Sequence, residues 1–452
     1  MKLSDIRATL QKIHVSPVKT LGQNFLHDQN LARWIVDQAQ ITSDDYVLEI
    51  GPGLGALTKL LLEKGARVLA IEKDTRLADF LRERFAHERL EILNIDALKF
   101  DARILFAHRR VKLLGNLPYN ISSALLFKFL EHPSPISLWL FTLQKEMAAR
   151  LSAKPSTHDY GALTLRIQLR HHVKYLRTIS ATVFLPRPEV DSAVVRILPR
   201  DPRESPPHDE GLLLELIRLG FSQRRKQLRK LLRERVDDWD TLARHVNIDP
   251  KARAEELSLL QWIGLVNFIA PLPCPDIGLT NNEHFPVVDK NDRILRDASR
   301  SDVHGNNLRH RAVHILIFNP TGEVYLQQRS RWKDRHPLKW DSSAAGHVIV
   351  AESYDETAQR ELKEELGISA SLTKIAKLPA SERTDYEFVW LYRGEVAGNL
   401  FPNRTEIETG AFFPRTVIDG WIAARPEDFA PGFIECWKVY CQKNCSSRSA
   451  PT

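Results

Sequence analysis

Short apolar runs alternate with amphipathic segments along residues 45–115. The apolar runs predict strands at 45–51, 67–74, 92–96 and 112–118, and the amphipathic segments predict helices at 58–65 and 75–86. This alternation indicates a parallel sheet covered by helices. Such sheets bind ligands at the carboxyl ends of their strands.

The pattern changes twice further along the chain. Residues 211–270 carry apolar positions at helical spacing and predict a small helical region. After residue 284, apolar strand-like runs precede and follow one helical stretch near 354–366, which predicts an α+β domain. We find no internal repeat and no low-complexity segment.

Two stretches rich in Pro, Asp, Asn and Ser, at 199–210 and 271–283, have the composition of loops and linkers. They divide the chain into an α/β Rossmann-like domain (1–200), a helical subdomain (201–270), a linker (271–283) and an α+β domain (284–445). A multidomain chain is also expected from its 452 residues.

Composition and charge predict the cellular location of the protein and the state of its cysteines. No apolar run is long enough to cross a bilayer and the N-terminus has no signal-peptide core, so we expect a cytoplasmic protein without membrane contact. The four cysteines form no CxxC pair and are expected to be free thiols. The net charge of +7 comes entirely from residues 1–283, where 41 Lys and Arg face 34 Asp and Glu.

A glycine turn follows the first predicted strand, and acidic residues follow the next two. Gly51 and Gly53 are expected to form a tight turn of the kind that binds several nucleotide cofactors. Tight turns that bind no ligand also use glycine. Glu72 ends the second strand, where a carboxylate can accept hydrogen bonds from both hydroxyls of a ribose. Asp96 follows the third strand and can accept a hydrogen bond from an adenine amino group.

Asn116, Pro118 and Tyr119 stand at the end of the fourth predicted strand. The Asn116 side chain and the Pro118 carbonyl offer two oxygen acceptors for the hydrogens of an exocyclic amine, which favours charge developing on that nitrogen during methyl transfer. Tyr119 can stack on an extruded base. The alternative without a catalytic role is a loop interrupted by a proline, with the tyrosine packed against the protein. Phe184 is either a second stacking ring or a core residue.

Five segments are distinctive: LGQNFL (21–26), EIGPGLG (49–55), NLPYNIS (116–122), FLPRPEVDSAVV (184–195) and FSQRRK (221–226). Together they resemble the ribosomal RNA adenine dimethyltransferases of the small-subunit KsgA/RsmA type, over about residues 15–270. The resemblance implies dimethylation of two adjacent adenines in the 3′-terminal hairpin of 16S rRNA, with S-adenosylmethionine as methyl donor. It implies that the cofactor contacts Asn24, Leu26, Gly51, Gly53, Glu72, Asp96 and Asn116.

Basic residues are dense after Phe221, in a segment that we predict to be one helix from Arg224 to Arg235. Its candidate RNA-binding residues are Arg224, Arg225, Lys226, Arg229 and Arg233. A solvated basic face is the alternative.

Residues 346–368 match the signature G-x5-E-x7-R-E-U-x-E-E-x-G-U, where U is aliphatic, and resemble the Nudix box. On a helix Glu361, Glu364 and Glu365 crowd one face, which suits Mg²⁺ or Mn²⁺ bound to a diphosphate substrate. Arg360 is expected to orient these glutamates, and Glu352 to support a second ion. A solvated acidic helix is the alternative.

Flanking motifs over about residues 284–440 are similar to the Nudix subgroup related to isopentenyl-diphosphate isomerase. Ala345 stands where the isomerases have a catalytic cysteine. We therefore expect hydrolysis of a nucleoside diphosphate derivative. Three histidines have two interpretations: they correspond to the metal site of the isomerases, or they are surface and packing residues. They are His304, His310 and His347. Glu387 is a further candidate acidic ligand.

The sequence thus predicts a bifunctional enzyme. The alternatives are a ribosome-assembly or transcription factor that uses the methyltransferase fold only for binding, a large-subunit rRNA methyltransferase of the antibiotic-resistance kind, and a C-terminal isopentenyl-diphosphate isomerase. The intact Glu72, Asp96 and Asn116 favour catalysis over binding alone. The NLPY and FSQRRK segments favour the small-subunit type.

Overall fold

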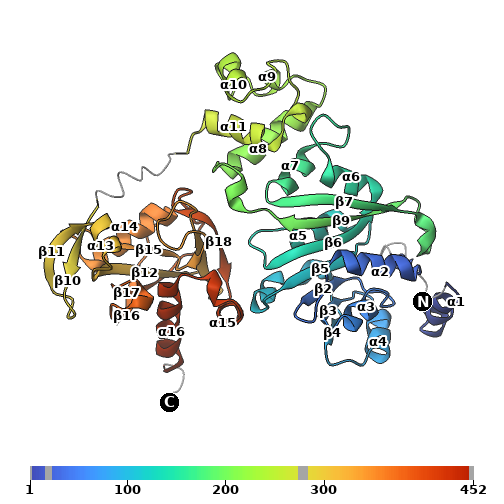
Figure 1. Ribbon diagram of the computed structural model, residues 1–452, viewed down its shortest axis with the longest axis horizontal. Helices are drawn as coiled ribbons and strands as arrows, with labels where there is room; N and C mark the ends of the chain where they lie inside the picture. The colour runs from blue at the N-terminus through green and yellow to red at the C-terminus, as the bar shows by residue number, and fades with distance from the viewer. Residues whose placement is uncertain (1–2, 16–22, 273–282, 447–452) are drawn as a thin grey trace. The chain divides into compact units, whose positions relative to one another are not determined.

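The computed structural model describes residues 3–15, 23–272 and 283–446, and shows two compact units, Met1–Pro271 and Leu272–Thr452 (Figure 1). Most of the proposed linker lies outside the described residues, as do Leu21 and Gly22. Within the described parts, no helix has the length and apolar character that spanning a membrane requires.

The first unit is built on a seven-stranded sheet in the order β4-β3-β2-β5-β6-β9-β7. The strands are β2 Tyr46–Ile50, β3 Arg67–Ile71, β4 Leu90–Leu93, β5 Val111–Asn116, β6 Ile136–Gln144, β7 His171–Ile179 and β9 Ser192–Pro199. β4, β3, β2, β5 and β6 are parallel, as predicted for the segments between 45 and 118. β9 lies antiparallel between β6 and β7, so the whole sheet is mixed.

Helices cover both faces of this sheet because its strands are apolar on both sides. Val47 packs with α2 and α3 on one face, and Leu48 packs with α5 and α6 on the other. The bounds are α1 Leu3–Lys12, α2 Gln29–Gln38, α3 Thr58–Glu63, α4 Thr75–Arg84, α5 Ser122–Phe129, α6 Lys145–Ser152 and α7 Ala162–Gln168. A small separate sheet pairs β1 Phe25–Leu26 with β8 Phe184–Leu185.

A helical region completes the first unit, with α8 Glu210–Gly220, α9 Leu228–Leu231, α10 Trp239–His245 and α11 Leu259–Ile269 (Figure 1). Its core surrounds the buried Trp262 and also includes Tyr160 and Leu165 from the α7 region. The helical region therefore packs directly onto the α/β domain.

The predicted helix over Arg224–Arg235 is wrong. A 3-10 turn at Phe221–Gln223 is followed by the four-residue α9, and the chain then turns. The Leu228 amide donates to the Ala252 carbonyl at 2.9 Å, and Gln227 bridges Arg253. Because these backbone groups pair with a distant segment, they are not used in a continuous helix.

The second unit contains a seven-stranded mixed sheet of the expected α+β type. Its main path is β14-β13-β12-β17-β16, with β15 paired to β12 and β18 paired to β13. The strands are β12 His310–Phe318, β13 Val324–Arg329, β14 Trp340–Asp341, β15 Ala344–His347, β16 Thr373–Leu378, β17 Glu387–Glu395 and β18 Ile407–Phe413. A separate hairpin joins β10 His284–Val288 to β11 Ile294–Ser299.

Among the described residues, the helices of the second unit are α13 Arg300–Gly305, α14 Tyr354–Leu366, α15 Arg415–Ala424 and α16 Pro431–Ser446. α14 packs Leu362 and Leu366 against β12. Its ends are well defined: Ser353 caps the N-terminus, and Gly367 ends the helix at φ 65°. This fixes the orientation of the acidic face.

Candidate active sites

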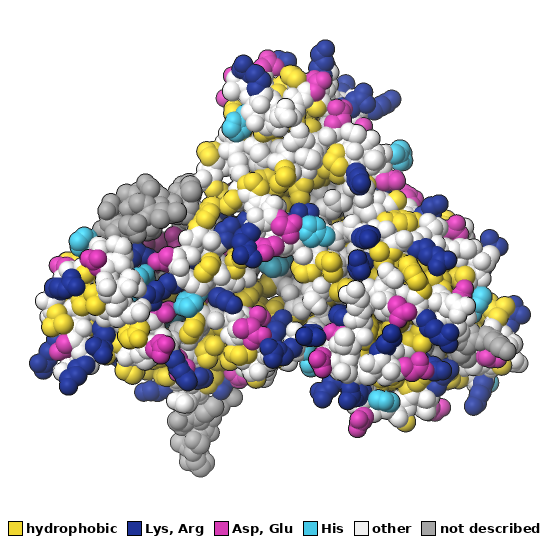
Figure 2. Space-filling model, in the orientation of Figure 1, with side chains coloured by type: hydrophobic (Ala, Val, Ile, Leu, Met, Phe, Trp, Pro, Cys, Tyr) yellow, Lys and Arg dark blue, Asp and Glu magenta, His cyan; other side chains and the backbone are white. Residues whose placement is uncertain are grey.

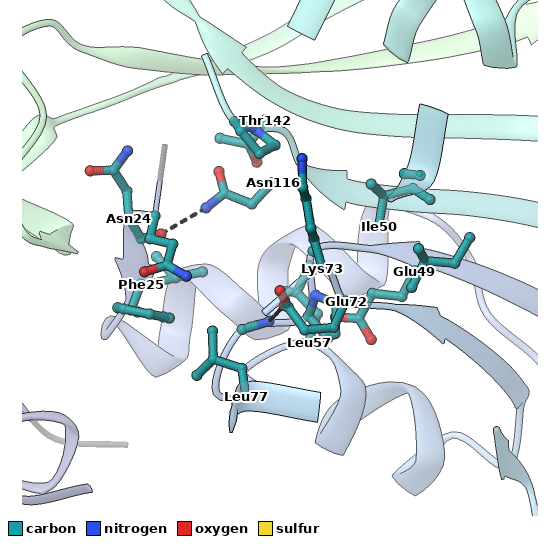
Figure 3. Close-up of a pocket in the computed structure, with 18 of the residues that line it drawn as sticks. Asn24, Phe25, Glu49, Ile50, Leu57, Glu72, Lys73, Leu77, Asn116 and Thr142 are labelled. Atoms are coloured by element: carbon teal, nitrogen blue, oxygen red, sulfur yellow. Dashed lines mark hydrogen bonds between the residues drawn. The ribbon is translucent and has the colours of Figure 1, made fainter. Parts of the chain in front are cut away.

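The first unit has a pocket at the carboxyl ends of β2, β3 and β5 (Figure 3). This is the edge of the sheet at which ligands bind in parallel α/β folds. The pocket is lined by all of the predicted cofactor residues, namely Asn24, Leu26, Gly51, Gly53, Glu72, Asp96 and Asn116, together with Pro118 and Phe184. Sequence segments up to 160 residues apart therefore meet at one place.

Because glycine has no side chain, the glycine turn places backbone atoms at the pocket wall. Gly51 and Gly53 have φ values of 67° and 57°, in the left-handed region that glycine adopts without strain. A Cβ atom at Gly53 would lie 3.0 Å from the Phe25 ring. The turn thus forms a tight cradle, which fits the close approach of a nucleotide cofactor.

Glu72 and Asp96 both lie at the pocket, with different surroundings. Glu72 is buried and accepts hydrogen bonds from the backbone amides of Gly53 (3.2 Å) and Asp74 (2.9 Å); burial raises its pKa. Asp96 accepts from Lys73 at 2.8 Å, and this contact lowers its pKa. Lys73 also lines the pocket and was not singled out from the sequence.

Asn116 ends β5 and is held by the N-terminal segment. Its Nδ2 donates to the backbone carbonyl of Asn24 at 2.9 Å, while the amide oxygen points away from Asn24 (Figure 3). The donor side of the amide is therefore occupied. Asn116 itself lines the pocket, and its amide oxygen is the atom of this side chain that can accept an amine hydrogen.

Tyr119 is half-buried, and its hydroxyl lies 2.5 Å from the hydroxyl of Ser192, the first residue of β9. Sequence reasoning did not identify Ser192, although it lies within the DSAVV run that carried the resemblance. Phe184 is 3% exposed and belongs to the core, yet it also lines the pocket. Its β8 strand pairs with Leu26 of β1, next to the cofactor residues.

The predicted RNA-binding residues are all exposed, but their contacts differ. Arg224 pairs with Glu255 at 3.0 Å and donates to the His158 carbonyl, which anchors the α8–α9 turn. Arg229 and Arg233 lie 3.9 and 3.8 Å from exposed acids, where ion pairing is weak. Figure 2 shows dark-blue Lys and Arg side chains at the surface over α9 and α10.

The Nudix segment places its glutamates as the signature demands. Gly346 faces Glu361 so closely that a Cβ atom would lie 2.0 Å from the carboxylate, so any larger residue there would displace the Glu361 side chain. Glu361 and Glu365 are largely buried, whereas the Glu364 side chain is 56% exposed. Burial, reinforced by the neighbouring Glu365 carboxylate, raises the pKa of Glu361 to about 8.

Arg360 organises this acidic face, as expected. It donates to Glu361 at 2.8 Å, to Glu364 at 3.0 Å and to Glu352 at 2.9 Å. Glu352 is thus engaged by Arg360 rather than standing ready for a second ion. The donor set of Glu361, Glu364 and Glu365 consists of carboxylates only and fits Mg²⁺ or Mn²⁺.

The three histidines cluster instead of being scattered. Ring nitrogens of His304, His310 and His347 lie within 4.8 Å of one another. The Glu387 carboxylate lies 3.0 Å from His347 Nε2 and 3.5 Å from His310 Nε2. Burial lowers the pKa of His347 to about 3, so its ring stays in the neutral form that binds metals. These four groups could hold a second cation.

These features define an α/β domain with a pocket at the carboxyl ends of its parallel strands, joined to an α+β domain with an acidic helix. Residues 17–271 match the model of the ribosomal RNA adenine dimethylase family, and residues 308–432 match the NUDIX domain. The chain belongs to the ribosomal RNA adenine dimethylase family. It combines an rRNA adenine dimethyltransferase domain with a Nudix hydrolase domain.

The curated relatives resemble the first unit. The Ribosomal RNA small subunit methyltransferase A of Chlorobium phaeobacteroides is 43% identical over 255 residues, which cover 56% of this chain and 94% of the relative. That of Bacillus mycoides is 39% identical over 271 residues, covering 57% and 93%. A dimethyladenosine transferase structure from Plasmodium falciparum is 26% identical, covers 53% and 95%, and has a TM-score of 0.45.

Proposed function

We propose that the first unit uses S-adenosylmethionine to dimethylate N6 of two adjacent adenines in the 3′-terminal hairpin of 16S rRNA. The names of the curated relatives support the small subunit as the substrate. The observation that carries the proposal is the Asn116–Asn24 hydrogen bond, because it leaves the Asn116 oxygen as an acceptor at the pocket.

When bound, S-adenosylmethionine supplies an electrophilic methyl group. We infer that the Asn116 oxygen and the Pro118 carbonyl accept the two hydrogens of the adenine amine and stabilise positive charge on that nitrogen. Tyr119 stacks on the flipped base, and the Ser192 hydroxyl fixes its ring. Glu72 and Asp96 hold the ribose and the adenine of the cofactor.

The test is transfer of labelled methyl groups from S-adenosylmethionine to purified ribosomal subunits. We expect label in small subunits that lack the modification, and none in large subunits. Binding to small subunits without transfer would instead support the assembly-factor alternative. Transfer to large subunits would support the antibiotic-resistance type.

We further propose that the second unit hydrolyses a pyrophosphate linkage in a nucleoside diphosphate derivative, with Glu361, Glu364 and Glu365 binding Mg²⁺ or Mn²⁺. An ion held by these carboxylates would supply polarisation of the phosphate and activation of water. The contact between Gly346 and Glu361 supports this assignment. Release of phosphate or nucleotide from a panel of diphosphates, lost in Glu364→Gln, is the expected result.

The cluster of His304, His310, His347 and Glu387 favours one second candidate, isomerisation of isopentenyl diphosphate. Ala345 argues against it, because alanine offers no group to act on the allyl carbon. Incubation of the full chain with isopentenyl diphosphate distinguishes the two. Formation of dimethylallyl diphosphate would favour the isomerase and remove the case for hydrolysis.

A further inference from the structure

Helix α1, Leu3–Lys12, precedes the segment that matches the ribosomal RNA adenine dimethylase family, which begins at residue 17. Its buried residues Ile6 and Leu10 pack in one apolar cluster with side chains that also line the cofactor pocket. These are Phe25, Leu54 and Leu77. An element outside the family segment therefore supports one wall of the pocket.

A polar contact holds the chain just after α1. The backbone carbonyl of His14 accepts a hydrogen bond from Arg76 Nη1 at 2.7 Å. Arg76 lies in the first turn of α4, and its Nη2 is 3.3 Å from Oδ2 of Asp74, the residue that caps this helix. One guanidinium group therefore binds both the end of the α1 segment and the start of α4.

Asp74 connects this guanidinium group to two walls of the pocket. Its backbone amide donates to Glu72 Oε1 at 2.9 Å, and its side-chain Oδ2 accepts from Gln23 Nε2 at 3.2 Å. Glu72 and Gln23 both line the pocket. Asp74 is buried, and a buried carboxylate needs a cation beside it, which Arg76 supplies. The contacts therefore run from α1 through Arg76 and Asp74 to the pocket.

We propose that residues 3–15 form an N-terminal strap that sets the affinity of the pocket for the cofactor, and that Arg76 is the positioning residue through which the strap acts. The inference rests on the proposed use of S-adenosylmethionine. With the strap docked, Arg76 holds Asp74, and Asp74 orients the Glu72 carboxylate and Gln23. With the strap undocked, the pocket must be ordered when the cofactor binds, and that cost lowers the affinity.

Titration calorimetry of the full chain with S-adenosylmethionine tests this without RNA. Ile6→Asp combined with Leu10→Asp should undock the strap, because unpaired charges are not tolerated in an apolar cluster. We expect this strap variant to bind the cofactor about tenfold more weakly, and Arg76→Gln about fivefold more weakly. Adding Arg76→Gln to the strap variant should cost nothing further, because both changes break the same chain of contacts.

The matched controls change the same charges at exposed positions. Ala8→Asp combined with Gln11→Asp alters the exposed face of α1, and Arg82→Gln breaks an exposed ion pair on α4. Both should leave cofactor affinity within about twofold of the wild type.

Two further measurements separate positioning from a general loss of structure. In methyl transfer, Arg76→Gln should raise KM for S-adenosylmethionine about fivefold and leave kcat within about twofold, because Arg76 does not touch the reacting groups. Because coupling is reciprocal, the cofactor should slow hydrogen exchange of the α1 amides about tenfold in the wild type, and about twofold in Arg76→Gln.

Wild-type affinity in the strap variant would overturn the role of α1, and wild-type affinity in Arg76→Gln would overturn that of Arg76. Additive losses in the combined variant would show that the strap does not act through Arg76. If the wild-type chain binds no S-adenosylmethionine, the proposed function itself fails. Calorimetric unfolding confirms that each variant is folded. If the strap variant is not, Arg76→Gln decides alone, since its side chain is 49% exposed and lies outside the core.

Discussion

The side-chain nitrogen of Asn116 donates a hydrogen bond to the backbone carbonyl of Asn24 across 92 residues of sequence, at 2.9 Å. The amide at the end of β5 and the N-terminal segment, which both line the pocket, are therefore held together. The bond also sets the orientation of the Asn116 amide.

Asn116→Ala should reduce methyl transfer by orders of magnitude while changing the affinity for S-adenosylmethionine only a few fold. The main partner of the amide oxygen is the reacting amine, so its contribution is largest in the transition state. Single-turnover rates and equilibrium cofactor binding are the two measurements. A loss confined to cofactor affinity would assign Asn116 to binding alone.

The Tyr119 ring should matter more than its hydroxyl. Tyr119→Ala removes the stacking surface and should lower methyl transfer by orders of magnitude. Tyr119→Phe and Ser192→Ala lose only the bond that orients the ring, so we expect less than a tenfold loss, mainly in KM for RNA. Ser137→Ala, on β6, is the control. Equal losses in Tyr119→Phe and Tyr119→Ala would contradict the stacking role.

Exposed arginines of the α9 region should supply RNA affinity. Replacing Arg225, Arg229 and Arg233 with Gln should lower the slope of log affinity against log salt by about 2 to 3, since fewer counterions are released. Arg224→Gln should instead reduce stability, because Arg224 anchors the turn through Glu255.

The control for the arginine variants replaces Lys290, Arg296 and Arg383, which are exposed on the Nudix domain. It removes the same charge and should leave the slope unchanged. An unchanged slope in the Arg225, Arg229 and Arg233 variant would assign these residues to solubility.

Glu49 should make the methyltransferase domain less stable as the pH rises. Burial raises its pKa to about 7, although the Thr58 hydroxyl donates to it. Because the folded pKa is above the unfolded value of 4.5, the stabilisation is complete below pH 4.5 and is lost as the pH rises through 7. The loss amounts to at most roughly 3 kcal/mol.

Glu49→Gln should therefore raise the melting temperature of this domain at pH 8 and change it little at pH 4.5. Differential scanning calorimetry identifies the relevant transition as the one that the cofactor shifts. A larger gain at acidic pH than at pH 8 would contradict the assignment.

Much of the fold could be predicted because local pattern and tertiary structure agree. The strands between residues 45 and 118 are apolar on both faces, and the Nudix helix has both caps and a complete signature. The basic segment after Phe221 was mispredicted because the backbone at Leu228 pairs with Ala252. Its helical side-chain pattern carries no sign of that contact.

The residues near the sites that the sequence did not predict were missed for one reason. Ser192 and Lys73 each contact a predicted site residue that is distant in sequence, Tyr119 and Asp96 respectively. Lys73 belongs to none of the motifs that carried the resemblance, and the DSAVV run that contains Ser192 does not reveal its contact with Tyr119. Clustering of His304, His310 and His347 likewise depends on three separate elements, α13, β12 and β15.

The central claim is tested most directly by primer extension across the 3′-terminal hairpin of 16S rRNA. The strain used has this chain as its only candidate dimethyltransferase. Wild-type protein and Glu364→Gln should both produce strong stops at two adjacent adenines, and Asn116→Ala should remove them. Readthrough with the wild-type protein, when the chain is present and folded, would contradict the account.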